Sequence, residues 1–179
     1  MDSLQGKLLV SSPALHDPNF RKTVVLIAHH DDEGAMGLVL SRPSEVAAAD
    51  AVPALEGLPG ASDPVFVGGP VQPEAFMVLA EFNDVDDAAA PIMDRLGFMP
   101  AESEPEDLSI SRMRLFAGYS GWGVGQLEAE LEESSWIVVD ALTDDAFFDD
   151  PDELWRTVLH RKGGPFELMI DMPFDPGLN

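Results

Sequence analysis

Short runs of aliphatic and β-branched residues recur along the chain, and glycine, proline or acidic residues separate most of them. Runs of this length and composition predict strands. Two of them, Thr23–His30 and Ala35–Ser41, flank the turn-forming tetrapeptide DDEG and predict a β-hairpin. The full set of expected strands lies within residues 4–12, 23–30, 35–41, 64–71, 75–82, 112–119 and 136–142.

For one predicted helix, the sequence contains capping residues at both ends. In the segment DDPDELWRTVLHRKGG, Asp150 is suited to the N-cap, Pro151 to the first turn and Glu153 to a capping box. Arg161 lies in the last turn, where a positive charge complements the helix dipole, and Gly163 suits the residue after the end.

Other helical patterns are weaker. Residues 44–58 predict a short helix broken by Pro53, residues 84–98 predict a helix limited by Pro91, and residues 13–22 predict a turn or very short helix. Strands outnumber helices and do not alternate strictly with them, which favours the α+β class.

Four glycines fall close together in FAGYSGWGVGQLEAELEESSW, residues 116–136. A phosphate-binding loop would need a lysine, and neither lysine nor arginine occurs between Leu115 and Trp155. The dinucleotide fingerprint fails because Gln126 stands where a third glycine is required, and the nucleophile elbow around Ser120 fails because Trp122 replaces its second glycine. We therefore interpret the glycines as a turn between a strand and a helix.

That helix should bury a stripe at helical spacing, formed by Val124, Leu127 and Leu131. Trp122, Tyr119 and Trp136 should pack around the junction. The sequence HHDD, residues 29–32, raises a metal site as an alternative. Neighbouring residues of a strand point to opposite faces, however, so we expect no metal site there.

Charge narrows the functional classes. Ten Lys and Arg stand against 33 Asp and Glu, a net charge of −23, which disfavours direct nucleic-acid binding and attraction to anionic membranes. An acidic surface can simply keep a protein in solution, or it can serve a basic protein partner. The chain has no cysteine, no basic leader at its N-terminus and no apolar run long enough for a membrane span, so we expect a cytoplasmic protein.

Three blocks of sequence, in order, resemble the signature blocks of the bacterial YqgE/AlgH family: SSPALHDPNFRKTVVLIAHHDDEGAMGLVLSRP, FVGGPV and GYSGWGVGQLEAELEESSW. The resemblance implies one domain over residues 1–179, with a bifurcated mixed β-sheet that is partly closed as a small barrel and flanked by helices. The tail from about residue 171 should be irregular. Function is unestablished in this family, and no DNA-binding module accompanies the fold.

The residues that match those blocks supply the candidate site. We expect one cleft for a ligand or partner, formed by Arg21, His30, Arg42, Tyr119, Trp122, Gln126 and Glu128. The matching glycines should shape the backbone, and these are Gly34, Gly37, Gly68, Gly69, Gly118 and Gly125. The alternative is a scaffold in which Arg21 and Arg42 pair with Asp17 or Glu128.

The leading hypothesis is a non-enzymatic binding or regulatory protein that acts on a protein partner or a small ligand, without a cofactor, a metal or a catalytic residue. The runner-up is an enzyme, such as a hydrolase, with His30 or Glu128 as its acid or base. Direct DNA binding ranks last, since it would need a basic patch built from Lys7, Arg21, Lys22 and Arg42.

Overall fold

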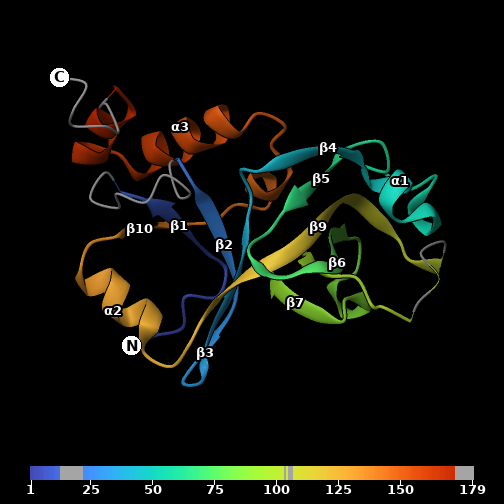
Figure 1. Ribbon diagram of the computed structural model, residues 1–179, viewed down its shortest axis with the longest axis horizontal. Helices are drawn as coiled ribbons and strands as arrows, with labels where there is room; N and C mark the ends of the chain where they lie inside the picture. The colour runs from blue at the N-terminus through green and yellow to red at the C-terminus, as the bar shows by residue number, and fades with distance from the viewer. Residues whose placement is uncertain (13–21, 103, 105–106, 172–179) are drawn as a thin grey trace.

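The fold was analysed in a computed structural model, which describes residues 1–12, 22–102, 104 and 107–171 (Figure 1). The predicted tail after residue 171 and most of the predicted turn at residues 13–22 lie outside the described residues. The elements in chain order are β1 (Lys7–Ser11), β2 (Val24–Asp31), β3 (Gly34–Val39), β4 (Pro43–Ala47), α1 (Ala48–Ala51), η2 (Pro53–Leu55), β5 (Pro64–Val67), β6 (Val71–Phe82), η3 (Val85–Asp87), β7 (Ala90–Met93), β8 (Leu96–Phe98), β9 (Ile110–Trp122), α2 (Gln126–Glu132), β10 (Trp136–Asp140), η5 (Thr143–Phe147), α3 (Pro151–Lys162) and η6 (Gly164–Asp171).

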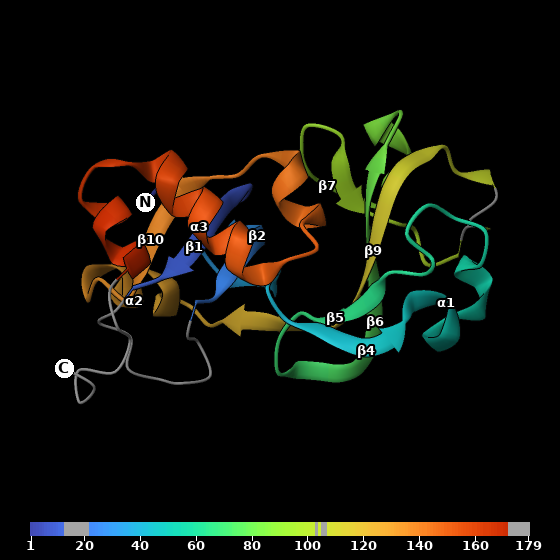
Figure 2. The same ribbon diagram turned by 90° about the horizontal axis from the view of Figure 1, so that it is seen from above.

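The described strands form one sheet in the order β10-β1-β2-β3-β9-β6-β8-β7, and β4 and β5 branch from it at β9. The β5–β9 pair is parallel, whereas the neighbouring β6–β9 and β3–β9 pairs are antiparallel. The predicted α+β class and bifurcated mixed sheet are therefore confirmed. Figures 1 and 2 show β9 running through both halves of the molecule, with α1, β4 and β5 in one half and α2, α3, β1 and β10 in the other.

The predicted barrel portion is wrong, because the sheet is open. Among the described residues, β7 pairs with β8 alone and β4 pairs with β5 alone. Closure would require hydrogen bonds between two such edges, and none are present between β4 and β7 as described.

Strand β2 is buried on both faces and lies at the centre of the half that contains α2 and α3. Val24 and Leu26 face a core that includes Trp155 of α3, while Val25 and Ile27 face a second core that includes Leu127 of α2. Alternate residues of a strand point to opposite faces, so the continuous apolar run of β2 fits a strand covered on both sides. Figure 1 shows α3 and α2 on opposite sides of β1 and β10.

Helix α3 follows its sequence signals. The Asp150 carboxylate accepts hydrogen bonds from the N–H groups of Asp152 and Glu153, at 2.9 and 3.3 Å. Gly163 ends the helix with a positive φ of 73°, which glycine adopts without a steric penalty. The apolar face, which includes Trp155, is fully buried.

The predicted helix over residues 84–98 is wrong, since this segment is a short η3 turn followed by the β7–β8 hairpin. Pro91 lacks the N–H that a helix interior requires, and Asp94 adopts a positive φ of 46° between the two strands. The hairpin buries Ile92 and Leu96 against the sheet. Residues 44–58 are only partly helical, because β4 covers their first residues and Pro53 begins η2.

The glycine-rich segment is mostly extended and does not form the predicted turn over its whole length. Strand β9 continues through Gly118 and Gly121 to Trp122, so the reversal is confined to the residues before α2. Val124 is 77% exposed, and its predicted place in the buried stripe is wrong. The predicted packing of Trp122 on Trp136 is confirmed, with the rings edge to face at 6.4 Å.

Arg114 of β9 binds the end of η5 and the residues that follow it. Arg114 is buried and donates to the carbonyl oxygens of Ala146 and Phe148 and to the Asp149 carboxylate. Its guanidinium lies 4.2 Å from the ring centre of Phe66. Burial lowers the pKa of Arg114, and the nearby carboxylates of Asp63 and Asp149 offset part of that effect.

Candidate functional site

His30 and Glu128 are the two predicted cleft residues that the fold joins directly. The side chain of His30, on β2, is only 3% exposed, and its Nε2 lies 2.8 Å from Oε1 of Glu128 on α2. The backbone N–H of Leu4 points at Nδ1 of the same ring, at 2.9 Å. Because an N–H donates to Nδ1, that nitrogen carries no hydrogen, and Nε2 carries the hydrogen that Glu128 accepts.

This arrangement leaves no free nitrogen on the His30 ring. The hydrogen bond from His30 is the largest cause that lowers the pKa of Glu128, so the carboxylate is held in its charged form. Ser3 adds a hydrogen bond from its hydroxyl to the His30 carbonyl oxygen, at 2.9 Å. The dyad therefore ties α2 and the N-terminal residues to β2.

An open groove lies at the tip of the β2–β3 hairpin, where β3 pairs with the end of β9. Ala35 is opposite Trp122 and Gly37 is opposite Ser120 in this pairing. The groove has a volume of about 520 Å³. It is lined by His29, Asp31, Glu33, Gly34, Ala35, Met36, Val71, Tyr119, Gly121, Trp122 and Gly123.

The polar side of the groove is acidic. His29 Nε2 lies 2.7 Å from the Asp31 carboxylate, and the N–H of Glu33 donates to the same carboxylate at 2.8 Å. The pKa of Asp31 is lowered, first by the hydrogen bond with His29 and then by that of Glu33. The lining also includes the partly buried Tyr119 and Trp122, but only 8% of Trp122 is exposed, because its ring packs in the core with Trp136. Carboxylates beside the aromatic ring of Tyr119 are chemistry that suits a cation.

The other predicted cleft residues take different places. Arg42 follows β3 at the end of the hairpin away from His30, where its carbonyl oxygen accepts from Val67. The Gln126 side chain accepts from the N–H of Gly123, at 3.1 Å, and helps to shape the start of α2. Arg21 and Asp17 lie outside the described residues. Glu128 bonds to His30, as described above, and Tyr119 and Trp122 are in the lining of the groove.

Four of the six predicted shaping glycines pack backbone against backbone, and one of them is Gly69, where a Cβ would lie 2.3 Å from the Tyr119 carbonyl oxygen. A Cβ on Gly68 would lie 2.4 Å from the Gly118 carbonyl oxygen, and one on Gly118 would lie 2.4 Å from that of Gly69. Gly34 similarly faces the Trp122 carbonyl oxygen, at 2.2 Å from a would-be Cβ. Such approaches bring β9 next to the segment after β5 and to the hairpin tip, and Gly34 also lines the groove.

The two remaining shaping glycines show different constraints. A Cβ on Gly37 would lie 2.7 Å from a methyl group of Val25, whereas Gly125 has open space around it and a positive φ of 73°. Gly37 is therefore needed for close packing, and Gly125 for its backbone conformation.

Several functional candidates were missed by the sequence interpretation. His29, Asp31 and Glu33 line the groove, and the alternation along β2 could have placed His29 on the face opposite His30. Glu130 of α2 lies against Trp122 and Trp136; burial raises its pKa, and the two indole groups lower it by less. No local pattern distinguishes Glu130 from its acidic neighbours.

Within residues 1–12, 22–102, 104 and 107–171, no group of three or more His, Asp or Glu side chains is placed to hold a metal ion. No helix described here is both long and apolar enough to cross a bilayer.

The sequence model of the AlgH-like family matches residues 8–167, which is most of the chain. This protein belongs to the YqgE/AlgH family. A UPF0301 protein of Streptomyces coelicolor is 41% identical over 187 residues, which cover 100% of this chain and 97% of the relative. A UPF0301 protein of Chlorobaculum tepidum is 37% identical over 181 residues, covering 97% and 95%.

Two solved structures have the same fold as this chain. The crystal structure of a Corynebacterium diphtheriae protein superposes with a TM-score of 0.82 at 27% identity, covering 96% of this chain and 93% of that one. The solution structure of the AlgH protein of Pseudomonas aeruginosa gives 0.74 at 28% identity, covering 96% and 95%.

Proposed function

We propose that this AlgH-like protein is a cytoplasmic, non-enzymatic binding protein whose groove at the β2–β3 hairpin takes a basic segment of a protein partner. The observation that carries the proposal is that Asp31, Glu33 and Tyr119 line one open groove. A lysine or arginine side chain bound there meets the two carboxylates and the Tyr119 ring.

The charge of the whole chain supports the same class of partner. A net charge of −23 accelerates the approach of a basic protein, since long-range attraction raises association rates. The groove is also open rather than enclosed, which suits a chain segment passing through it. The absence of cysteine fits a reducing compartment.

The enzyme alternative has less support. A general base needs a free lone pair within reach of a substrate proton, and both ring nitrogens of His30 are engaged by Leu4 and Glu128. The Glu128 carboxylate accepts from His30 and has its pKa lowered, which makes it a weaker base. The dyad fits a structural tie better than an acid–base pair.

Direct DNA binding also has less support. Lys7 forms an ion pair with Asp140, and Lys22 lies 3.9 Å from Asp152. Two of the four basic residues that a DNA-binding patch would require thus face carboxylates.

The test uses fluorescently labelled peptides with a central lysine or arginine flanked by glycine and serine, at low ionic strength. We expect saturable binding by fluorescence anisotropy that weakens about tenfold in Asp31→Asn/Glu33→Gln and in Tyr119→Ala. The matched control, Asp86→Asn/Asp87→Asn, removes two exposed charges from η3 in the other half of the molecule. Equal weakening in the control would show that only net charge acts, and absence of binding to every peptide would refute the proposal.

A further inference from the structure

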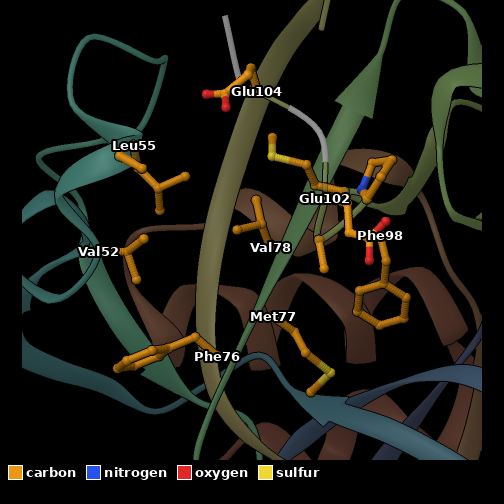
Figure 3. A pocket seen from close by; sticks show the side chains of 12 residues that line it. Val52, Leu55, Phe76, Met77, Val78, Phe98, Glu102 and Glu104 are labelled. Carbon is orange, nitrogen blue, oxygen red and sulfur yellow. The ribbon is translucent and has the colours of Figure 1, made fainter. Parts of the chain in front are cut away.

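A second pocket, separate from the groove, opens in the half of the molecule that contains α1 and β6. It lies between the α1–η2 segment on one side and β6 and β8 on the other, and its volume is about 520 Å³. Figure 3 shows Val52 and Leu55 across from Met77, Val78 and Phe98. This volume is typical of sites that bury small organic molecules.

The body of the pocket is apolar and adaptable. Phe76 is 47% exposed, an unusual position for a phenylalanine, and Phe98 provides a second ring in the lining. Met77 and Met99 also line the space, and the flexible methionine side chain accommodates ligands of different shape. Leu55, in contrast, is buried in the core cluster of this half, so the pocket has a fixed base.

The charged residues of the pocket favour a positively charged ligand. The ionisable side chains among its described lining residues are two carboxylates, Glu102 and Glu104, and no lysine, arginine or histidine accompanies them there. Figure 3 shows Glu102 beside Phe98 and Glu104 farther out, on the side of Leu55. An apolar space with carboxylates beside it favours a ligand that has an apolar body and a positive end.

We propose that this pocket binds a small amphipathic cation, an ammonium group carried on an aryl or alkyl body. The body displaces water from Phe76, Val78 and Met99, and the ammonium group meets Glu102 or Glu104. The face of the Phe76 ring adds attraction for a cation. An anion with the same body lacks the carboxylate contacts and is repelled by them.

The test compares two probes that share one body and differ in charge, 4-phenylbutylammonium and 4-phenylbutyrate, by ligand-observed NMR titration of the full chain. We expect the ammonium compound to bind with a Kd below about 1 mM. The carboxylate compound should bind at least about tenfold more weakly. Phe76→Ala should raise the Kd for the ammonium probe about tenfold, and this half-exposed position should tolerate the change.

A charge-matched comparison separates the pocket from the net charge of the protein. Glu102→Gln/Glu104→Gln should raise the Kd about fivefold, whereas Glu132→Gln/Glu133→Gln, which removes two exposed charges around the end of α2, should change it less than about twofold. Asp31→Asn/Glu33→Gln should leave it unchanged, because the groove is a different site. Equal binding of both probes, equal effects of the two glutamate pairs, loss of binding in the groove variant, or no binding at about 5 mM would each overturn the proposal.

Discussion

His30 and Glu128 are 98 positions apart in the chain, and a single hydrogen bond of 2.8 Å between their side chains joins β2 to α2. The Leu4 N–H fixes which nitrogen donates, since it occupies the other one. The tie therefore depends on three segments that meet only in the folded protein.

A double-mutant cycle measures the coupling energy between the side chains of His30 and Glu128. His30→Ala, Glu128→Ala and the double variant, unfolded with urea at pH 7, should give a coupling energy of about 0.5–1.5 kcal/mol. His30→Ala alone should destabilise by about 2–3 kcal/mol, because it also leaves the Leu4 N–H without its acceptor and opens a cavity. A coupling energy near zero would mean that the hydrogen bond contributes nothing to stability in solution.

The Glu128 carboxylate should make part of the stability depend on pH. Its folded-state pKa is lowered, chiefly by the His30 hydrogen bond, so its contribution is present above the unfolded pKa of about 4.3 and is lost as the pH falls through the folded value. The difference in unfolding free energy between the wild type and Glu128→Gln should shrink as the pH falls from about 5 to about 3. Urea unfolding at four pH values tests this, with Glu132→Gln as the exposed control. A constant difference would contradict the assignment.

Glu130 should behave in the opposite way. Burial raises its pKa in the folded protein, so the folded state holds a proton more readily, and stability falls as the pH rises from the unfolded pKa through the folded one. Glu130→Gln imitates the neutral form and should raise the unfolding free energy at pH 7, with no gain below about pH 4. Thermal unfolding at both pH values measures the effect; destabilisation at pH 7 would show that the carboxylate interactions with Trp122 and Trp136 outweigh burial.

Two glycines with almost the same φ should respond differently to alanine. Gly118 has φ 71° and would bring a Cβ within 2.4 Å of the Gly69 carbonyl oxygen, while Gly125 has φ 73° and nothing within 4 Å. Gly125→Ala should cost about 1 kcal/mol for the left-handed conformation alone. Gly118→Ala should cost about 3 kcal/mol or more, because the backbone of the neighbouring segment must also move. Similar losses in the two variants would argue against the close packing of β9 on residues 68–69.

The two arginines of β9 provide a further matched pair. Arg114 is 2% exposed and donates to backbone carbonyls, whereas the Arg112 side chain is 36% exposed and pairs with Glu81 and Asp144. Arg114→Ala should destabilise by about 3 kcal/mol, because buried acceptors lose their donor. Arg112→Ala should cost about 1 kcal/mol or less. Chemical denaturation distinguishes them, and equal losses would show that burial of Arg114 is not what matters.

The sequence alone determined the elements whose signals are local. Asp150, Pro151 and Gly163 define α3 through contacts within a few residues, and the DDEG turn defines the β2–β3 hairpin in the same way. The resemblance of three sequence blocks also identified the family. Membership of that family predicted the branched sheet. These features need no knowledge of distant segments.

Tertiary structure decided the elements and sites that depend on distant partners. Residues 90–98 form a hairpin because β8 finds a partner in β6, and the glycine-rich end of β9 stays extended because β3 pairs with it. The same pairing brings Trp122 to the hairpin tip and creates the groove, while Arg42, chosen from the same sequence blocks, lies at the other end of the hairpin. Burial and the backbone hydrogen bonds across the sheet set the register between strands. The pattern of residues along the chain does not indicate which strands pair with each other.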